Sequence, residues 1–163
     1  MKEGRLKIFY GPMYSGKSAY LIKDILNNID QSKLVFKPMS DERSEKVYTR
    51  EGLVFDAIAI DAPSEILDYV EDWVRVIYID EINFFDGTLV DIVKQVLAMG
   101  IDVVVSGLDK DYRNEYFDSS KGIIDYADIS VKLKATKFSE LRPCSSHFSL
   151  TVFAPFITMK SGS

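Results

Sequence analysis

Short apolar runs alternate along the chain with segments in which apolar residues recur at helical spacing. The first run covers residues 6–10 and ends at Gly11. After it, intervals of three and four residues, which place side chains on one face of a helix, separate a set of apolar positions: Leu21, Ile22, Ile25, Leu26 and Ile29. The start of the chain therefore predicts a strand, a glycine-bearing loop and an amphipathic helix.

Two further short strands are expected in the next part of the chain. Residues 34–36 are apolar and are followed by Pro38, which cannot donate a hydrogen bond to a strand ladder. Residues 54–60 are expected to form the next strand. Between these runs, residues 39–50 are rich in charge and have no apolar period, so we expect a loop there.

The second half of the chain repeats the alternation. Residues 74–79 (VRVIYI) are β-branched and aromatic, as in a central parallel strand, and residues 101–105 form another buried run. Helical spacing marks two segments between strands, one starting at Pro63 and one ending near Gly100: Ile66, Leu67 and Val70, then Leu89, Ile92, Val93, Val96 and Leu97. Alternation marks a last strand at three positions, Ile129, Val131 and Leu133, and no period follows residue 134.

Strands that alternate with helices predict an α/β fold with a central, mostly parallel sheet flanked by helices. Parallel neighbours require crossover connections, which are almost always right-handed. Ligands on such sheets bind beyond the carboxyl ends of the strands. Groups of polar residues follow several of the predicted strands, so these ends are where we expect the functional site.

Composition narrows the classes of protein that fit. The 163 residues suit one domain, and no apolar run reaches the ~20 residues that cross a bilayer. A net charge of −5 opposes broad nucleic-acid binding, which rewards clustered Lys and Arg. Cys144 is the single cysteine, so no intramolecular disulfide can form, as expected in a reducing compartment. The first residues lack a secretory signal, and we expect a cytoplasmic protein without membrane or nucleic-acid partners.

The loop after the first strand matches the phosphate-binding P-loop, in which two glycines bracket four residues before Lys-Ser. The motif comprises Gly11, Pro12, Met13, Tyr14, Ser15, Gly16, Lys17 and Ser18, and all but Pro12 are expected nucleotide contacts. Backbone amides in such a loop surround phosphate oxygens, assisted by the positive end of the following helix. Lys17 is expected to reach the β- and γ-phosphates of ATP, and the Ser18 hydroxyl to bind Mg²⁺.

An acidic pair, Asp80 and Glu81, directly follows the predicted strand at residues 74–79. In P-loop proteins a carboxylate at a strand end holds Mg²⁺, which is the role expected of Asp80. A neighbouring carboxylate is suitably placed to accept the proton of an alcohol during phosphoryl transfer. Position alone leaves open whether Glu81 is that base or only a neighbour.

Four segments occur in the order and approximate spacing found in thymidine kinases of the human cytosolic and bacterial type: GPMYSGKS, KPMSDER, YIDEINFF and GLDKDYRNEYF. The chain resembles this family over residues 6–135. The resemblance implies a P-loop NTPase (RecA-like) fold. It also implies transfer of the γ-phosphoryl group of ATP, with Mg²⁺, to the 5′-hydroxyl of thymidine or a related deoxynucleoside, in nucleotide salvage for DNA synthesis. By the same resemblance the protein is a homo-oligomer, specifically a tetramer.

The resemblance also implies roles for individual residues around the phosphates. Lys17, Glu81 and Arg43 match catalytic residues of the family, with Glu81 as the base and Arg43 beside the transferring phosphoryl group. Ser18 and Asp80 match its magnesium ligands. Asp41 is expected to position Arg43, although a charge run of this kind is often only a solvated surface.

A nucleoside pocket is implied on the other side of the reaction centre. Apolar and aromatic residues match its lining in the family: Met13, Phe84, Leu108, Tyr112 and Phe117. Ordinary core packing is the alternative for each of these side chains. Asp109 and Arg113 are either polar lining of the same pocket or surface charge.

The sequence departs from the family pattern in two places. Family members usually hold a structural zinc with four Cys or His ligands, whereas this chain has only Cys144 and His147, so we expect no structural zinc. We therefore expect a P-loop kinase domain over residues 1–135, and a degenerate zinc and lasso region or flexible tail over residues 136–163. Asn83 stands where the family commonly has Gln, which shortens the reach of that amide.

The sequence is compatible with three alternative functions. The leading one is a thymidine kinase or related deoxynucleoside kinase, because the phosphoryl-transfer residues are intact. The second is a catalytically silent, thymidine-kinase-like paralogue that binds nucleotide, suggested by the missing zinc ligands. The third is a P-loop ATPase acting on nucleic acid, which the acidic charge balance opposes.

Overall fold

The computed structural model describes residues 3–12, 15–27, 32–39, 46–48, 54–134 and 156–159. For Lys46–Tyr48, Val54–Asp56 and Phe156–Met159 it describes the backbone alone. The Met13 and Tyr14 positions of the P-loop lie outside these ranges, as does the 40–45 segment that contains Arg43.

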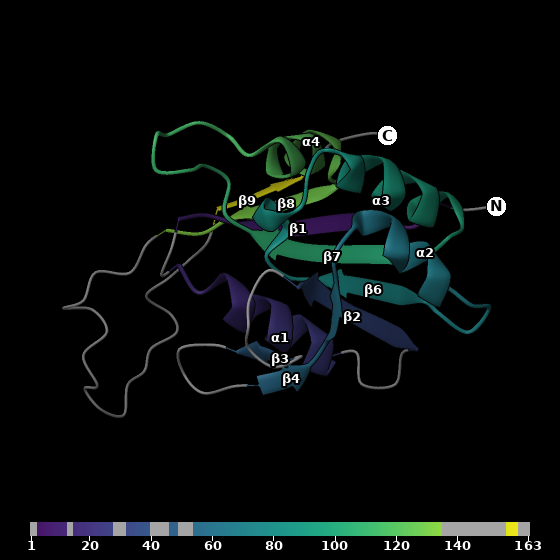
Figure 1. Ribbon diagram of the computed structural model, residues 1–163. Helices are drawn as coiled ribbons and strands as arrows, with labels where there is room; N and C mark the ends of the chain where they lie inside the picture. The colour runs from purple at the N-terminus through teal and green to yellow at the C-terminus, as the bar shows by residue number, and fades with distance from the viewer. Residues whose placement is uncertain are drawn as a thin grey trace, which may run out of the picture.

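A central sheet of seven strands in the order β5-β2-β6-β7-β1-β8-β9 organises the fold (Figure 1). The strands of this sheet are β1 (Leu6–Tyr10), β2 (Lys33–Pro38), β5 (Ile58–Ile60), β6 (Val76–Ile79), β7 (Asp102–Gly107), β8 (Ile129–Lys132) and β9 (Phe156–Met159). The first six strands in this order are parallel to one another, and β9 pairs antiparallel with β8. The expected α/β fold with a mostly parallel, helix-flanked sheet is confirmed.

Helices cover both faces of the sheet. They are α1 (Lys17–Asn27), α2 (Ile66–Tyr69), α3 (Thr88–Ala98) and α4 (Asp118–Tyr126), with short 3₁₀ turns η1 (Pro63–Glu65) and η2 (Ile82–Phe84). Residues of α1 pack into one apolar cluster with alternate side chains of the strands, whereas those of α2, α3 and α4 pack into a second cluster on the other face. In Figure 1, α3 and α4 accordingly lie away from α1. No helix among the described residues is long and apolar enough to span a membrane.

The two faces follow from the alternation of side chains along each strand. In β6, Ile77 and Ile79 belong to the α3 side, whereas Val76 and Tyr78 belong to the α1 side. All four are buried, as expected of a central parallel strand covered on both faces. The apolar run that predicted this strand is therefore explained by two buried faces.

Several sequence predictions need correction. The segment 39–50, expected to be a loop, contains strand β3 (Lys46–Tyr48), which pairs antiparallel with β4 (Val54–Asp56). The single strand expected over 54–60 is two strands, because β4 belongs to this hairpin and β5 to the main sheet. Leu26, expected on the buried face of the first helix, is 49% exposed.

Candidate active site

The P-loop connects β1 to α1 at the carboxyl edge of the sheet. Gly16 has a φ of 84°, in the left-handed region that glycine adopts without strain. Gly11 is needed for a different reason, because a Cβ on it would lie 2.5 Å from the carbonyl oxygen of Leu133. Both glycines of the motif thus have a conformational cause in this fold.

Lys17, the first residue of α1, lies over the P-loop. Its ammonium donates hydrogen bonds to the carbonyl oxygen of Pro12 at 2.8 Å and to the hydroxyl of Ser15 at 3.4 Å. Ser15 is buried, whereas Pro12 and Gly16 of the same loop are exposed. The contact places the lysine cation where the loop would hold a phosphate.

Opposing influences act on the protonation of Lys17. Burial lowers its pKa, whereas the carboxylates of Asp80, Asp109 and Glu81 act in the opposite direction and only in part offset the burial. The three acids therefore lie close enough to Lys17 to affect its charge. Carboxylates that follow two strand ends thus act on the P-loop lysine.

Asp80 is buried at the end of β6 and receives hydrogen bonds from three elements. The Ser18 hydroxyl at the start of α1 donates to its two carboxylate oxygens, at 3.4 Å and 3.2 Å. The Ser106 hydroxyl of β7 and the backbone N–H of Glu81 both donate to Oδ1, the latter at 2.9 Å. Loss of solvation nevertheless raises the Asp80 pKa above its usual value, because it outweighs these hydrogen bonds and the nearby Lys17.

Ser18 and Asp80 are suited to magnesium. A hydroxyl and a carboxylate are the hard oxygen ligands that Mg²⁺ prefers, and the hydrogen bond between them places both at one point. A buried carboxylate with a raised pKa also gains from a cation beside it. The described residues contain no group of three or more His, Cys, Asp and Glu that could hold a metal. Mg²⁺ is usually held by one or two protein oxygens together with phosphates and water, which is the kind of site that Ser18 and Asp80 would offer.

Glu81 adopts an unusual backbone conformation directly after Asp80. Its φ of 52° and ψ of 46° lie in the left-handed region, which is uncommon for a residue with a side chain. The hydrogen bond from its N–H to Asp80 supports this turn into η2. Strained backbone of this kind is concentrated at functional sites, so the geometry strengthens the case for Glu81.

The expected pocket residues come from η2 and from the segment after β7. Phe84 is 59% exposed, while Leu108 and Phe117 are half-buried. The side-chain oxygen of Asn83, which is buried, accepts a hydrogen bond from the Leu108 N–H at 3.0 Å. Asn83 therefore connects η2 to the segment after β7. Its replacement of the Gln that is common in the family did not suggest this contact.

The loop between β7 and α4 ends in an exposed turn. Asp111 organises this turn, because its Oδ1 accepts hydrogen bonds from the N–H groups of Arg113 and Glu115 at 2.8 Å and 3.0 Å. Tyr112 is 94% exposed and lines no enclosed cavity here. Arg113 pairs with Asp111 on the surface, whereas Asp109 is buried, so the two polar candidates differ in setting.

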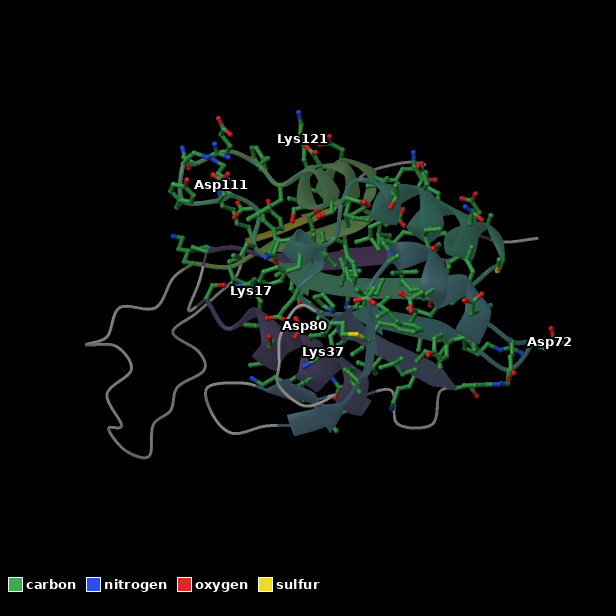
Figure 2. All side chains as sticks on the ribbon, in the orientation of Figure 1. Lys17, Lys37, Asp72, Asp80, Asp111 and Lys121 are labelled. Atoms are coloured by element: carbon green, nitrogen blue, oxygen red, sulfur yellow. The ribbon has the colours of Figure 1, made fainter. Side chains whose placement is uncertain are left out.

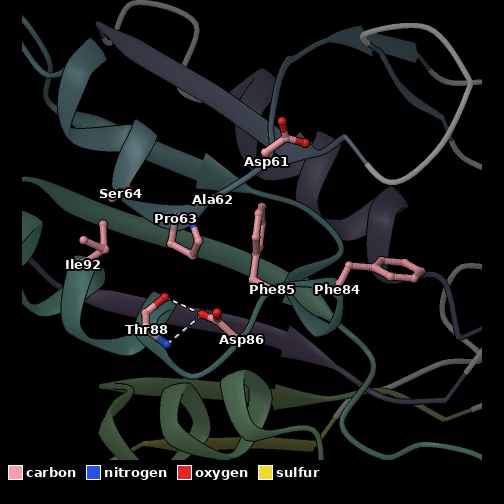
Figure 3. A pocket seen from close by; sticks show the side chains of 9 residues that line it. All are labelled: Asp61, Ala62, Pro63, Ser64, Phe84, Phe85, Asp86, Thr88 and Ile92. Atoms are coloured by element: carbon pink, nitrogen blue, oxygen red, sulfur yellow. Dashed lines mark hydrogen bonds between the residues drawn. The ribbon is translucent and has the colours of Figure 1, made fainter.

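A cavity of about 360 Å³ lies between the loop after β5 and the start of α3. Its lining comprises Asp61, Ala62, Pro63, Ser64, Phe84, Phe85, Asp86, Thr88 and Ile92 (Figure 3). The Phe85 ring stands among these residues, whereas the Phe84 ring points away from them.

Sequence reasoning missed Ser106, which contacts the candidate magnesium ligand. Its only signal was a serine that interrupts the apolar run of a predicted buried strand. Six other candidates lie outside the described residues: Met13 and Tyr14 of the P-loop, Asp41 and Arg43 of the KPMSDER segment, and Cys144 with His147.

The fold and the site define a class. A P-loop on β1 faces a buried aspartate on β6, with β7 between them, and a second carboxylate follows that aspartate. This is the arrangement of a P-loop protein that binds a nucleoside triphosphate with a metal ion.

Comparison with known proteins gives the family. The thymidine kinase family model matches residues 4–151. The thymidine kinases of Ureaplasma parvum and Ureaplasma urealyticum are each 35% identical over 142 residues, covering 82% of this chain. That of Pseudothermotoga lettingae is 33% identical over 136 residues, covering 81% of this chain and 74% of the relative. The chain belongs to the thymidine kinase family, and it spans 64% of the length of the Ureaplasma relatives.

Proposed function

We propose that this protein is an ATP-dependent deoxynucleoside kinase acting on thymidine or a closely related deoxynucleoside. The observation that carries the proposal is the contact of the P-loop Ser18 with Asp80, directly beside Glu81. This contact joins the phosphate-binding and acidic motifs in one site. The thymidine kinases that the chain resembles support the choice of nucleoside.

The reaction assigns a task to each group. Lys17 and the P-loop amides bind the β- and γ-phosphates. Ser18 and Asp80 would hold Mg²⁺, which would neutralise charge on the phosphate oxygens when bound. Glu81 accepts the proton of the 5′-hydroxyl as its oxygen bonds to the γ-phosphorus and the bond from that phosphorus to ADP breaks. Arg43, proposed by resemblance, stabilises the charge on the transferring group.

The nucleoside is proposed to lie on the side of η2 that carries Phe84. There the exposed ring of Phe84 offers a stacking surface, with Leu108 and Phe117 nearby in the segment that Asn83 ties to η2. Met13 and Tyr112 complete the proposed lining. A homo-oligomer, a tetramer by family resemblance, and a cytoplasmic location remain part of this proposal.

An ADP-release assay with five nucleosides tests the function: thymidine, deoxyuridine, deoxycytidine, deoxyadenosine and deoxyguanosine. Release of ADP should require both Mg²⁺ and a nucleoside, with thymidine or deoxyuridine turned over fastest. Glu81→Gln should lower kcat by about 10²–10⁴ while nucleotide binding persists, because only proton transfer is lost. Lys17→Ala should weaken nucleotide binding itself.

The ADP-release assay also defines the result that would contradict the proposal. Binding of Mg-ATP without turnover of any nucleoside would support the silent paralogue instead. No feature of the described residues favours that alternative. The contacts of Lys17 with the P-loop, of Ser18 with Asp80 and of the Glu81 N–H with Asp80 support the active kinase.

A further inference from the structure

One buried charge at the carboxyl edge of the sheet has no role so far. Lys37, near the end of β2, is only 5% exposed. Lysine is almost never this enclosed unless anions or other oxygen atoms surround its ammonium. The residue also belongs to the KPMSDER segment, in which only Asp41 and Arg43 have been given functions.

Strand pairing places Lys37 beside Asp80. Strands β2 and β6 are parallel and in register, with Phe36 opposite Ile79. The pairing continues one residue further, because the Asp80 N–H donates to the Phe36 carbonyl at 2.9 Å. The next residue of each strand is therefore Lys37 on β2 and Asp80 on β6, about 4.8 Å apart across the ladder.

Both side chains lie on the face of the sheet that α1 covers. Val35 and Tyr78 pack with α1, whereas Phe36 and Ile79 pack in the opposite cluster. Side chains alternate along a strand, so Lys37 lies on the same face as Val35. Asp80 lies on this face too, because it contacts Ser18 at the start of α1. Figure 2 shows Lys37 and Asp80 on the side of the sheet that carries α1.

The charges around the proposed phosphate site suggest a function for Lys37. Ser18 of the P-loop contacts Asp80, and Glu81 follows Asp80 directly, so in the proposed reaction two carboxylates from the end of β6 would lie near the γ-phosphoryl group. They repel its negative oxygens. Lys17 opposes this repulsion from the P-loop side, and Lys37 comes from the far side of β6, on a stem long enough to cross one strand spacing.

We infer that Lys37 is a further catalytic residue whose ammonium binds the γ-phosphoryl group from the β2 side, opposite Lys17. The inference rests on the proposed function for the direction of transfer. A cation fixed there before reaction stabilises charge that spreads over the phosphoryl oxygens in the transition state. Because the inferred contact is with the γ-phosphoryl group, Lys37 would distinguish a triphosphate from a diphosphate.

Calorimetry with two nucleotides tests the inference. Mg-ADP and the Mg complex of the non-hydrolysable β,γ-imido analogue of ATP would be titrated into wild type and Lys37→Met. The variant should bind the analogue about tenfold more weakly or worse, and Mg-ADP within about twofold of wild type. Lys37→Arg, which keeps the charge, should restore much of the difference.

Lys33→Met is the matched control. Lys33 is on the same strand but at its other end, where its ammonium donates to the Ile25 carbonyl of α1 at 3.4 Å. It should leave both affinities unchanged. Turnover provides a second measure: Lys37→Met should lower kcat by about 10²–10³ with little change in the KM for nucleoside.

Two outcomes would overturn the inference. Equal loss of affinity for both nucleotides would mean that Lys37 only supports the fold, and unchanged affinities with unchanged kcat would mean that it does not reach the phosphate. If Lys37→Met fails to fold, NMR of the lysine ammonium groups in the wild type decides. The Lys37 signal is assigned as the one missing from Lys37→Arg, and it should shift when the ATP analogue is added but not when Mg-ADP is added. Failure of the kinase proposal would be recognised separately. In that case Lys37→Met would still weaken binding of the ATP analogue more than binding of Mg-ADP, but the wild type would turn over no nucleoside.

Discussion

Single residues in this site are held in states that are unfavourable for folding and useful for binding. Asp80 is a buried carboxylate with a raised pKa, Lys17 is a lysine with a lowered one, and Glu81 has left-handed backbone. Each belongs to a short motif that the sequence analysis had identified. Local motifs predicted these identities because the P-loop and the acidic pair are short segments, whereas Ser106 and Lys37 became visible only when strands were paired.

Asp80→Asn is expected to raise stability without nucleotide while abolishing transfer. A carboxyl whose pKa is raised by folding favours the fold below its unfolded pKa of 3.8 and loses that contribution as pH rises. At neutral pH the wild type therefore carries the cost of a buried charge, and the amide does not. We expect a gain of about 1 kcal/mol, or a few degrees in Tm.

Thermal unfolding of both proteins without Mg-ATP, from neutral to mildly acid pH, measures this effect. The advantage of the variant should shrink as the pH falls and should vanish below 3.8, where the wild-type carboxyl becomes protonated in the unfolded state as well as in the folded one. A lower Tm for the variant at neutral pH would contradict the prediction and show that the charged hydrogen bonds to Ser18 and Ser106 outweigh desolvation.

Elements were predicted best where their apolar patterns are complete. The strand ending at Asp80 and the helix α3 follow runs that are buried as expected. Helix α4 was missed because two of its three buried residues, Ser119 and Ser120, are polar and gave no apolar period. Ser119 is satisfied by the Ile82 carbonyl of η2 at 2.7 Å, a contact that depends on tertiary structure.

The contact of β7 with η2 leaves no room for a side chain at Gly107. A Cβ there would lie 2.7 Å from Cγ1 of Ile82 and 3.0 Å from the Asn83 oxygen. Gly107→Ala should therefore displace η2, destabilise the fold by about 1–3 kcal/mol and reduce kcat, since Glu81 begins this turn.

Gly87→Ala serves as the comparison for Gly107→Ala. The nearest atom to a Cβ on Gly87 is 3.8 Å away, and its φ of −64° suits alanine. Denaturant unfolding and turnover should show it within about 0.5 kcal/mol of wild type. Similar behaviour of both variants would mean that η2 moves freely and does not fix Glu81.

For the whole molecule, the sequence predicted the central parallel strands of the sheet but not the strand β9 at its edge. Strand β9 lies in a part of the chain without apolar period, yet its backbone pairs with β8 from Ile129 opposite Met159 to Lys132 opposite Phe156. Long-range antiparallel pairing leaves little trace in local pattern. The sequence expectation of a separate region over 136–163 is thus open to direct test.

Removal of residues 136–163 should lower the Tm by several degrees and promote self-association, because it exposes the edge of β8. Removal of 160–163 alone, which retains β9, should change neither property. Thermal unfolding and size-exclusion chromatography measure both. An unchanged Tm in the longer truncation would mean that this segment is an appendage, as the sequence suggested.

Strand β7 has a consequence beyond its own contacts. It lies between β1 and β6, pairing Tyr10 with Gly107 and Ile79 with Val105. The phosphate-binding half and the acidic half of the centre are thus mounted on strands that never meet, roughly two strand spacings, or about 9.6 Å, apart. The separation of the two halves is therefore set by the backbone hydrogen bonds of β7, a strand that contributes Ser106 as a partner of Asp80 but none of the proposed reacting groups.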